Sequence, residues 1–574
     1  MKNNALIALL FMLIGLGPNL WAQSNNMASI TRTFALTNVN IVERPGQVIE
    51  MGTIIIQDGL IHSVGKNVKI PANAKVVDAD SMFVYAGFID ALSHTGIPKP
   101  ETNNNQGGRR SRPQGVIPGT PTNVQAGITP ELKVSSVLSA KEKSISDMRQ
   151  VGFTTAHVVP MGRMLPGQGA IVLLSGNSAN GMVLRDQASL FSQLTGARGV
   201  YPATVIAVMS KWRELYKQAQ QAQAHETVYK LDPKGMPRPE YDPTLQAFYP
   251  VLNGDLPVFF AANGVKDIHR VLKLKEDLAF PLVLAEVKEG WHAANRIKNM
   301  NVPVVLSLEL PKEPKKDDKK KKEGADEEVA KEKTMADKEK EQLEKRRAAE
   351  MENFNKQASM MANKGIAFGF STLDVKSKDI KANLRRMIEN GLSEDQALAA
   401  LTTVPAKMLG LSNMMGTVEE GKIANLVVST APYFEEDSNV RYVFVDGTLY
   451  EYEVKKKKKA AAGDSEAVAD PVGSWSYGID IPGQEAVGTL MISPSGDDYT
   501  GEMSFNDDDA PPVTLSSMTL EGNTLTFSGS IETDGQTLNL NFEVIIEGDS
   551  MEGTLSIPNF GTFDMEGERE PKRR

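Results

Sequence analysis

The sequence predicts an α/β protein with three parts: a (β/α)8 barrel, a composite β-sandwich built from both flanks of the barrel, and a separate all-β C-terminal domain. Short apolar strands alternate with helical stretches over residues 87–411, β-rich segments flank that region on both sides, and strand-and-turn patterns fill residues 472–568. Repeated strand–helix units are typical of a parallel barrel. A doubly wound open sheet is the second choice, because no glycine-rich phosphate loop follows the first strand.

The two flanking segments, residues 33–86 and 412–453, share one pattern of alternating apolar and polar residues. Asp58-Gly59 and Asp446-Gly447 are hairpin signals between such runs. Because both flanks have the same character, we expect one β-sandwich assembled from both.

The barrel region contains several strand candidates and one charged insert. The candidates include "GFIDAL", "FTTAHVV", "GAIVLL", "LPVFFAA", "FPLVLAE", "VPVVLSLEL" and "IAFGFS". Residues 312–347 consist almost entirely of Lys, Glu, Asp and Ala, so they cannot bury a core. We expect a disordered, solvated loop that leads into an exposed helix, and a partner-binding role for it remains open.

The N-terminus is typical of a secretory signal peptide. Residues 1–22 contain Lys2, an apolar stretch from Ala5 to Leu16, and a small-residue cleavage site ending at Ala22. The apolar stretch is short for a membrane anchor, and no later segment is predicted to span a bilayer. We therefore expect a periplasmic or secreted protein.

Composition excludes several kinds of chemistry. The 574 residues include no cysteine, which excludes disulfides, thiolate nucleophiles and cysteine-bound zinc. The formal net charge of −9 gives no reason to expect nucleic acid as a partner.

The C-terminal segment follows a linker at residues 454–471 and is predicted to be a small antiparallel barrel or sandwich over residues 472–568. Its aromatics Trp475 and Tyr477 suit either a packed core or a glycan-binding surface. The aspartates at 507–509 suit a solvated turn better than a calcium site, because the wider ligand spacing of calcium loops is missing.

Three stretches, in order along the chain, resemble the motifs of one known family. "YAGFIDALSH" is similar to a "PGFID-x-H-x-H" motif, "GFTTAHVVPMGRMLPGQGA" (Gly152 to Ala170) to a second barrel segment, and "LSEDQALAALTTVPAKMLGLSNMMGTVEEGKIANLVV" (Leu392 to Val428) to a closing signature. The family is the amidohydrolase superfamily, in particular its imidazolonepropionase-like and periplasmic branches. The resemblance extends over residues 33–453 and implies a TIM-like (β/α)8 barrel.

The resemblance also implies a metal-dependent hydrolase of non-peptide carbon–nitrogen bonds. In the family, a His-x-His pair, a carboxylated Lys or a Glu, two further His and a final Asp gather at the carboxyl ends of the strands. The metal lowers the pKa of a bound water, and the Asp moves the proton.

Most of those ligand positions hold residues that cannot bind a metal ion. They are Leu92 in the first pair, Leu173 or Leu174 for the lysine, and Ala261 for one histidine, while the next histidine position falls at Ala285 or at Glu286, which could bind a metal ion. Leucine and alanine at these places suit an apolar barrel interior better than an altered metal site.

The residues that remain give one incomplete site. His94, His157 and Glu286 are the candidate metal ligands, for zinc or another divalent ion, and Asp374 is the candidate catalytic residue, with Thr372 and Leu373 as neighbouring alternatives for its position. A catalytic zinc usually has three protein ligands and an open position. The simpler alternative is that His94 and His157 are buried barrel residues hydrogen-bonded to neighbours.

These observations favour a secreted amidohydrolase-like protein whose metal centre is largely lost and which acts as a non-catalytic binding or structural partner, as a homodimer or with an active relative. The alternative is an active one-metal amidohydrolase that acts on N-acyl, cyclic amide or dipeptide-like substrates.

Overall fold

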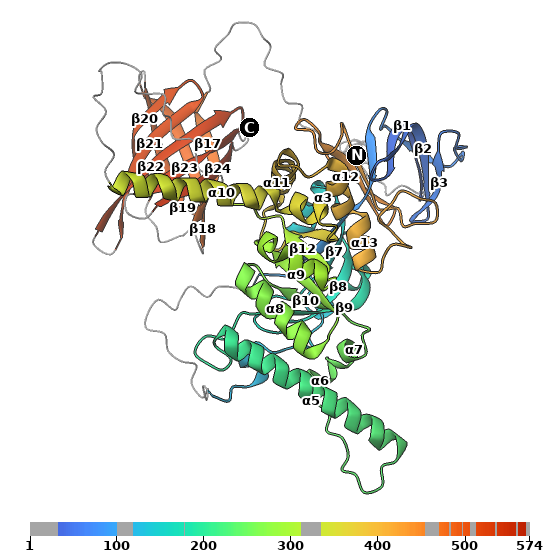
Figure 1. The fold of residues 1–574 in the computed structure, drawn as a ribbon. Helices are drawn as coiled ribbons and strands as arrows, with labels where there is room; N and C mark the ends of the chain where they lie inside the picture. Colours follow the sequence, from blue (N-terminus) through green and yellow to red (C-terminus); the bar gives the residue numbers. More distant parts are fainter. Residues whose placement is uncertain are drawn as a thin grey trace, which may run out of the picture. The chain divides into compact units, whose positions relative to one another are not determined.

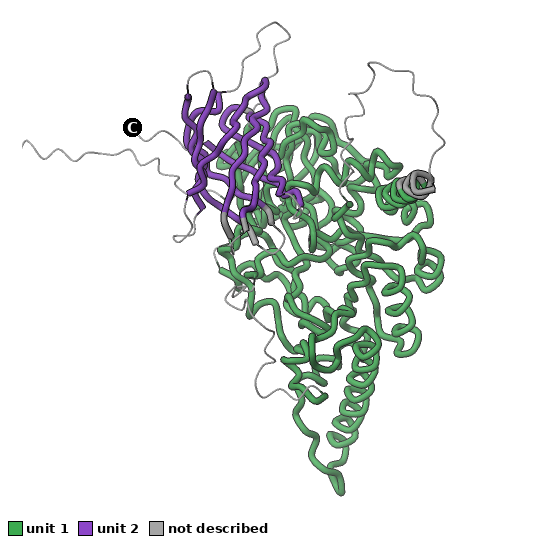
Figure 2. The backbone as a smooth tube through the Cα atoms, turned by 90° about the vertical axis from the view of Figure 1, so that its left-hand side faces the viewer, with its two compact units in different colours: residues 1–455 green, residues 456–574 purple. Residues whose placement is uncertain are grey.

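The computed structural model places most of the chain (Figure 1). It describes residues 32–99, 119–176, 178–311, 335–453, 470–481, 484–495, 498–505, 512–533, 536–557 and 561–569. The predicted signal peptide, residues 312–334 of the insert, residues 454–469 of the linker and the aspartates at 507–509 lie outside the described residues. The chain divides into two compact units, residues 1–455 and 456–574 (Figure 2).

A closed barrel of eight strands forms the centre of the first unit. Its strands are β6 (Phe88–Ser93), β7 (Phe153–Val158), β8 (Gly167–Leu173), β9 (Val183–Gln193), β10 (Val258–Ala261), β11 (Leu282–Val287), β12 (Val304–Ser307) and β13 (Phe368–Ser371). Alternate residues face the two sides of each strand. In β11, Val283 and Ala285 pack in the barrel interior, whereas Leu282 and Leu284 pack in the surrounding core.

The barrel is mixed, so the prediction of a fully parallel barrel is wrong. Strand β8 runs antiparallel to both β7 and β9, while the remaining neighbours pair in parallel. Residues 159–166, which join β7 to β8, contain no helix. A connection this short returns the chain antiparallel, because a parallel pair needs a longer crossover.

Helices fill the other connections of the barrel (Figure 1). In α11, Ile380, Leu384 and Met387 are buried at helical spacing, which gives the helix one apolar face. The helices are α2 (Asn123–Ala126), α3 (Lys143–Gln150), α4 (Ala179–Met182), α5 (Val205–Leu231), α6 (Pro243–Gln246), α7 (Tyr249–Leu252), α8 (Val265–Leu278), α9 (Ala294–Asn299), α10 (Met335–Asn363), α11 (Ser377–Glu389), α12 (Glu394–Leu401) and α13 (Thr403–Met408), with 3-10 turns η1 (Val134–Ser136) and η2 (Gly290–Ala293).

Both flanking segments join one mixed sheet, since β14 pairs with β5, and β5 pairs with β1. Its strands are β1 (Thr33–Arg44), β2 (Gln47–Gln57), β3 (Leu60–Gly65), β4 (Lys75–Val77), β5 (Phe83–Ala86), β14 (Leu426–Ser429), β15 (Val440–Val445) and β16 (Thr448–Glu451). The described strands thus form a single sheet where we expected a sandwich. The sheet curls over its own core, because the rings of Phe34 and Phe444 lie 5.6 Å apart although two strands separate β1 from β15.

Both predicted hairpin turns are present and lie against each other. Asp58, Gly59, Asp446 and Gly447 all have positive φ (+50°, +85°, +51° and +71°), as type I′ turns require. A Cβ atom on Gly447 would lie 2.6 Å from the Cα atom of Gly59. The glycine at this contact is therefore required by both conformation and space.

Replacing Gly447 by alanine is expected to lower the free energy of unfolding of the first unit by about 2–3 kcal/mol, because left-handed strain and a backbone clash add together. Gly421 is the matched control: its φ is +84°, but nothing lies within 4 Å of an added Cβ. Urea unfolding of both variants measures the difference. Equal losses would show that the packed turns contribute nothing beyond their backbone conformation.

The second unit is a closed antiparallel barrel in which each strand pairs with the next and the last pairs with the first. Its strands are β17 (Gly473–Ile481), β18 (Gln484–Ser495), β19 (Asp498–Phe505), β20 (Val513–Glu521), β21 (Thr524–Thr533), β22 (Gln536–Glu547), β23 (Ser550–Ile557) and β24 (Gly561–Arg569). Trp475 and Tyr477 are 0% and 4% exposed, so they belong to its core, and the alternative of a glycan-binding surface at these residues is wrong. Among the described residues, no helix is long and apolar enough to cross a membrane.

Candidate functional site

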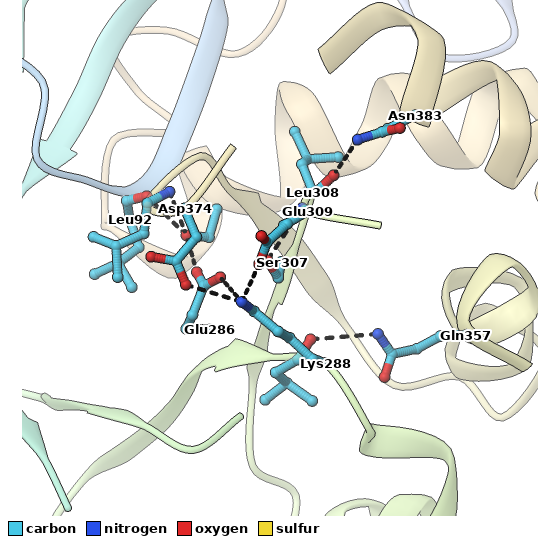
Figure 3. Close-up of polar contacts among 12 residues, drawn as sticks. Leu92, Glu286, Lys288, Ser307, Leu308, Glu309, Gln357, Asp374 and Asn383 are labelled. Carbon is cyan, nitrogen blue, oxygen red and sulfur yellow. Dashed lines mark hydrogen bonds and ion pairs between the residues drawn. The ribbon is translucent and has the colours of Figure 1, made fainter. Parts of the chain in front are cut away.

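The carboxyl ends of the barrel strands bring charged residues together on one rim. In three successive strands an apolar run ends in a charged residue: Lys288 after β11, Glu309 after β12 and Asp374 after β13. Parallel strands place such residues at the same end of a barrel. Figure 3 shows that these side chains point toward one another, together with Glu286 of β11. We call Glu286, Lys288, Glu309 and Asp374 the Lys288 cluster.

A backbone irregularity aims Glu286 at this cluster. The pairing of β11 with β12 shifts register between Leu284 and Val287, and Glu286 has a φ of +50°. Leu284 and Val287 both pack outside the barrel, whereas Ala285 packs inside and Glu286 contacts the inward Ser371. A bulge re-aims a side chain in this way, and a non-glycine residue with positive φ stores strain that is typical of functional sites.

Lys288 lies at the centre of the cluster. Its ammonium nitrogen contacts Glu309 Oε2, lies 2.9 Å from Asp374 Oδ2, and lies 3.9 Å from Glu286 Oε1. Burial opposes the charged form, but the carboxylates of Glu309 and Asp374 outweigh it and hold the pKa of Lys288 above its ordinary value. The lysine is therefore a fixed cation at neutral pH.

Glu286 is the most buried member, at 1% exposure, and its Oε1 atom has no hydrogen-bond partner among the described residues. Burial raises the pKa of Glu286 to about 7, against the opposing effect of the Ser307 and Ser371 hydroxyls. Ser371 Oγ contacts Glu286 Oε2, lies 3.0 Å from Leu92 O, and accepts from Leu373 N at 3.1 Å. The single hydroxyl hydrogen of Ser371 cannot bond to both Leu92 O and Glu286 Oε2. A protonated Glu286 resolves this, because its carboxyl group donates to Ser371 Oγ and the Ser371 hydroxyl then donates to Leu92 O.

His94 follows β6 and is the available imidazole at the rim. Its Nδ1 atom donates to Val159 O at 2.8 Å, which leaves Nε2 without a hydrogen-bond partner in the part of the chain that the structure describes. Burial lowers the pKa of His94, so the ring is neutral at pH 7.

His157 lies inside the barrel and is fully buried. Its Nδ1 atom donates to Ala91 O at 2.9 Å, its Nε2 atom accepts from Ser189 Oγ at 2.8 Å, and its ring packs on Phe259 at 4.4 Å. Burial lowers the pKa of His157 to about 4. Both ring nitrogens are used within the barrel wall, so His157 has no lone pair to offer at the rim.

The positions where relatives have ligands are packing positions here. Leu92 and Ala285 are fully buried among the apolar residues of the barrel interior, and Ala261 packs against them. Leu173 and Leu174, our candidates for the lysine position, are placed wrongly. Strand β8 is antiparallel, so its carboxyl end lies at the rim opposite the Lys288 cluster, where Leu173 pairs with Thr155 near the start of β7.

Sequence reasoning missed three polar residues: Lys288, Glu309 and Asp90. Asp90 is fully buried in β6, its Oδ2 atom accepts from the Thr372 hydroxyl, and its Oδ1 atom accepts from the backbone N–H groups of Leu92 and Thr372 at 3.2 and 3.3 Å. An aspartate inside an apolar strand, and a charged residue within three positions after each of three strands, were the available signals.

The side chains at the carboxyl ends of the barrel strands do not form a binding site for the catalytic metal ion that the family resemblance implies. Within the described ranges no three His, Asp, Glu or Cys residues gather as a metal-binding group. Asp374 and Glu309 already contact the Lys288 ammonium, which would repel a divalent ion, and His157 is satisfied elsewhere. Among the described residues at the rim, His94 Nε2 and Glu286 Oε1 remain as possible ligand atoms, fewer than the three protein ligands that a catalytic zinc usually has.

The eight-stranded mixed α/β barrel, joined to a sheet built from both flanking segments, defines the fold class as a TIM-like barrel with an added β sheet. Residues 321–450 match the model described as Amidohydrolase family. An amidohydrolase from Thermotoga maritima MSB8 has the same fold, with a TM-score of 0.59 and 19% identity over 73% of this chain and 100% of that one. The family model thus agrees with the resemblance of the motifs over residues 321–450, and the solved structure shows that the fold is shared.

Two further solved structures match with lower TM-scores. A prolidase complexed with N-methylphosphonate-L-proline matches with a TM-score of 0.42 and 16% identity, and an Xaa-Pro dipeptidase with bound methionine in the active site with 0.39 and 14%. Each match covers 73% of this chain and all of the other. No curated protein matches the chain.

Proposed function

We propose that this protein is a non-catalytic member of the amidohydrolase superfamily, exported to the periplasm, whose barrel serves as a binding or structural partner. The observation that carries the proposal is the small number of side chains at the rim that could bind a metal ion. Leu92 and Ala261 occupy ligand positions, His157 is hydrogen-bonded through both nitrogens, and His94 is left as a single imidazole donor.

The candidate proton acceptor is also engaged. Asp374 would have to take a proton from an attacking water, but its Oδ2 atom lies 2.9 Å from the Lys288 ammonium. The carboxylate oxygen that would accept the proton is therefore already occupied by the ammonium. A general base must lie within hydrogen-bond reach of the water it activates, so the pairing opposes the role.

The test uses the mature chain, residues 23–574, purified without chelators from cells supplied with zinc, nickel and manganese. Metal analysis is expected to find far less than one ion per chain, and a panel of N-acyl amino acids, cyclic amides and dipeptides is expected to remain unhydrolysed. Light scattering of the same sample measures whether the chain forms a homodimer. Stoichiometric metal together with turnover would refute the proposal.

A second candidate, an active one-metal amidohydrolase, is favoured by two unfilled acceptors, His94 Nε2 and Glu286 Oε1. There His94 and Glu286 would bind the ion, and Asp374 would move the proton. A His94→Ala variant separates the two candidates: loss of both metal and hydrolysis supports the second, and unchanged properties support the first.

A further inference from the structure

The Lys288 cluster contains one cation for three carboxyl groups. Glu286, Glu309 and Asp374 come from three adjacent strand ends, and each lies within 4 Å of the same ammonium nitrogen. Side chains in the cluster range from 1% exposure for Glu286 to 47% for Glu309, and Lys288 is 21% exposed. Carboxyl groups gathered at a partly buried site repel one another unless a cation lies among them.

The backbone that carries Lys288 is fixed from outside the barrel. Gln357 of α10, which is 3% exposed, accepts from Gly290 N at 2.6 Å and donates to Val287 O at 3.3 Å. Asn383 of α11 donates to Leu308 O at 2.9 Å, beside Glu309. Two buried amide side chains thus fix the backbone at the strand ends that carry Lys288 and Glu309 (Figure 3). The cation is positioned by the fold, unlike an ion pair between mobile surface side chains.

We infer that the Lys288 ammonium is the resident structural cation of this barrel rim and takes the charge-balancing role that a metal ion has in hydrolytic members of the fold. This inference rests on the proposed function, because it explains how the rim stays folded with a reduced ligand set. Two observations support it beyond the acidic residues themselves. The buried Glu286 Oε1 atom is unpartnered and directed at the ammonium, and the strained backbone of Glu286 brings it there.

The first test removes the charge and keeps the volume. A Lys288→Met variant is expected to raise the ratio of unfolded to folded protein at least tenfold, measured by urea unfolding at pH 8. Lys273→Met is the matched control, because Lys273 also meets two carboxylates, Asp277 at 2.9 Å and Glu276 at 3.6 Å, but is 57% exposed. The control is expected to change the ratio less than threefold. Equal effects of the two substitutions would overturn the inference.

The second test asks whether replacing one carboxylate stabilises or destabilises the protein. Asp374→Asn is expected to destabilise the protein when Lys288 is present, because the ammonium loses a partner. In the Lys288→Met background the same substitution is expected to stabilise it, because repulsion between the carboxylates of Asp374 and Glu309 is relieved. If Lys288→Met alone does not fold, the triple variant Lys288→Met/Glu309→Gln/Asp374→Asn is expected to fold. A substitution that keeps one sign in both backgrounds, or an unfolded triple variant, contradicts the inference.

The third test returns a cation to the cavity. Lys288→Ala removes the ammonium and most of its alkyl chain, so n-propylammonium chloride is expected to recover at least half of the lost melting temperature relative to sodium chloride at equal ionic strength. A recovery no greater than that in sodium chloride would contradict the inference. All three readouts measure stability, so turnover by the wild-type chain would refute the proposed function without deciding this inference.

Discussion

Replacing His157 by leucine is expected to lower the free energy of unfolding of the first unit by about 2–5 kcal/mol, although leucine has a similar volume. The loss arises because Ala91 O and Ser189 Oγ are buried and would both lose their hydrogen-bond partner. Leaving a buried polar atom unpaired costs about 1–3 kcal/mol for each atom. Urea unfolding in a Trp475→Phe background, where fluorescence reports on the tryptophans of the first unit, measures the change.

A double-variant cycle shows whether the hydrogen bond is the cause. Ser189→Ala removes the hydroxyl that donates to His157 Nε2. The double variant His157→Leu/Ser189→Ala is therefore expected to lose clearly less free energy of unfolding than the sum of the losses in the two single variants. His62→Leu is the control, because His62 is an exposed histidine of β3 and its replacement is expected to change stability by less than about 0.5 kcal/mol. The metal content of His157→Leu is expected to equal that of the wild type. A stable variant that had lost a bound metal would instead make His157 a ligand.

The sequence was informative about the barrel because local patterns decide most of it. The apolar strand runs, the helical spacing of α11 and the turn residues at Asp58-Gly59 and Asp446-Gly447 each depend on neighbours within a few positions. The direction of β8 does not, because an apolar run looks the same in a parallel and an antiparallel strand. Only the short, helix-free connection at residues 159–166 carried that information.

The candidate site was less predictable because its geometry depends on a break in strand periodicity. Alternation predicts inward side chains at Ala285 and Val287 of β11, but the shift at Glu286 turns Val287 outward and brings the glutamate in. The partners of Lys288 are 21 residues away at Glu309 and 86 residues away at Asp374. Such contacts depend on the register in which the strands pair when the barrel closes. A single sequence does not specify that register.

Asp90 predicts how the stability of the first unit changes with pH. Burial raises the pKa of Asp90 to about 7, against the opposing effect of its hydrogen bonds from Thr372, Leu92 and Ser93. An unfolded chain releases this proton near pH 4, so between pH 4 and 7 the folded state binds more protons than the unfolded state. The contribution of Asp90 is therefore fully present below pH 4, falls as the pH rises to 7, and is constant above it. The total loss is about 4 kcal/mol.

The Asp90→Asn variant isolates this effect from other titrating groups. Its amide oxygen can keep both backbone donors and its NH2 group can donate to Thr372, yet it does not titrate. The stability of the wild type relative to Asp90→Asn is expected to fall by about 4 kcal/mol between pH 4 and 8. His157 acts in the opposite sense, because its lowered pKa removes stability as the pH falls from about 6.5 to 4, but it is present in both proteins and cancels in the difference. A difference that stays flat across this range would mean that Asp90 is already ionised in the folded protein at pH 4, and its hydrogen bonds would then outweigh its burial.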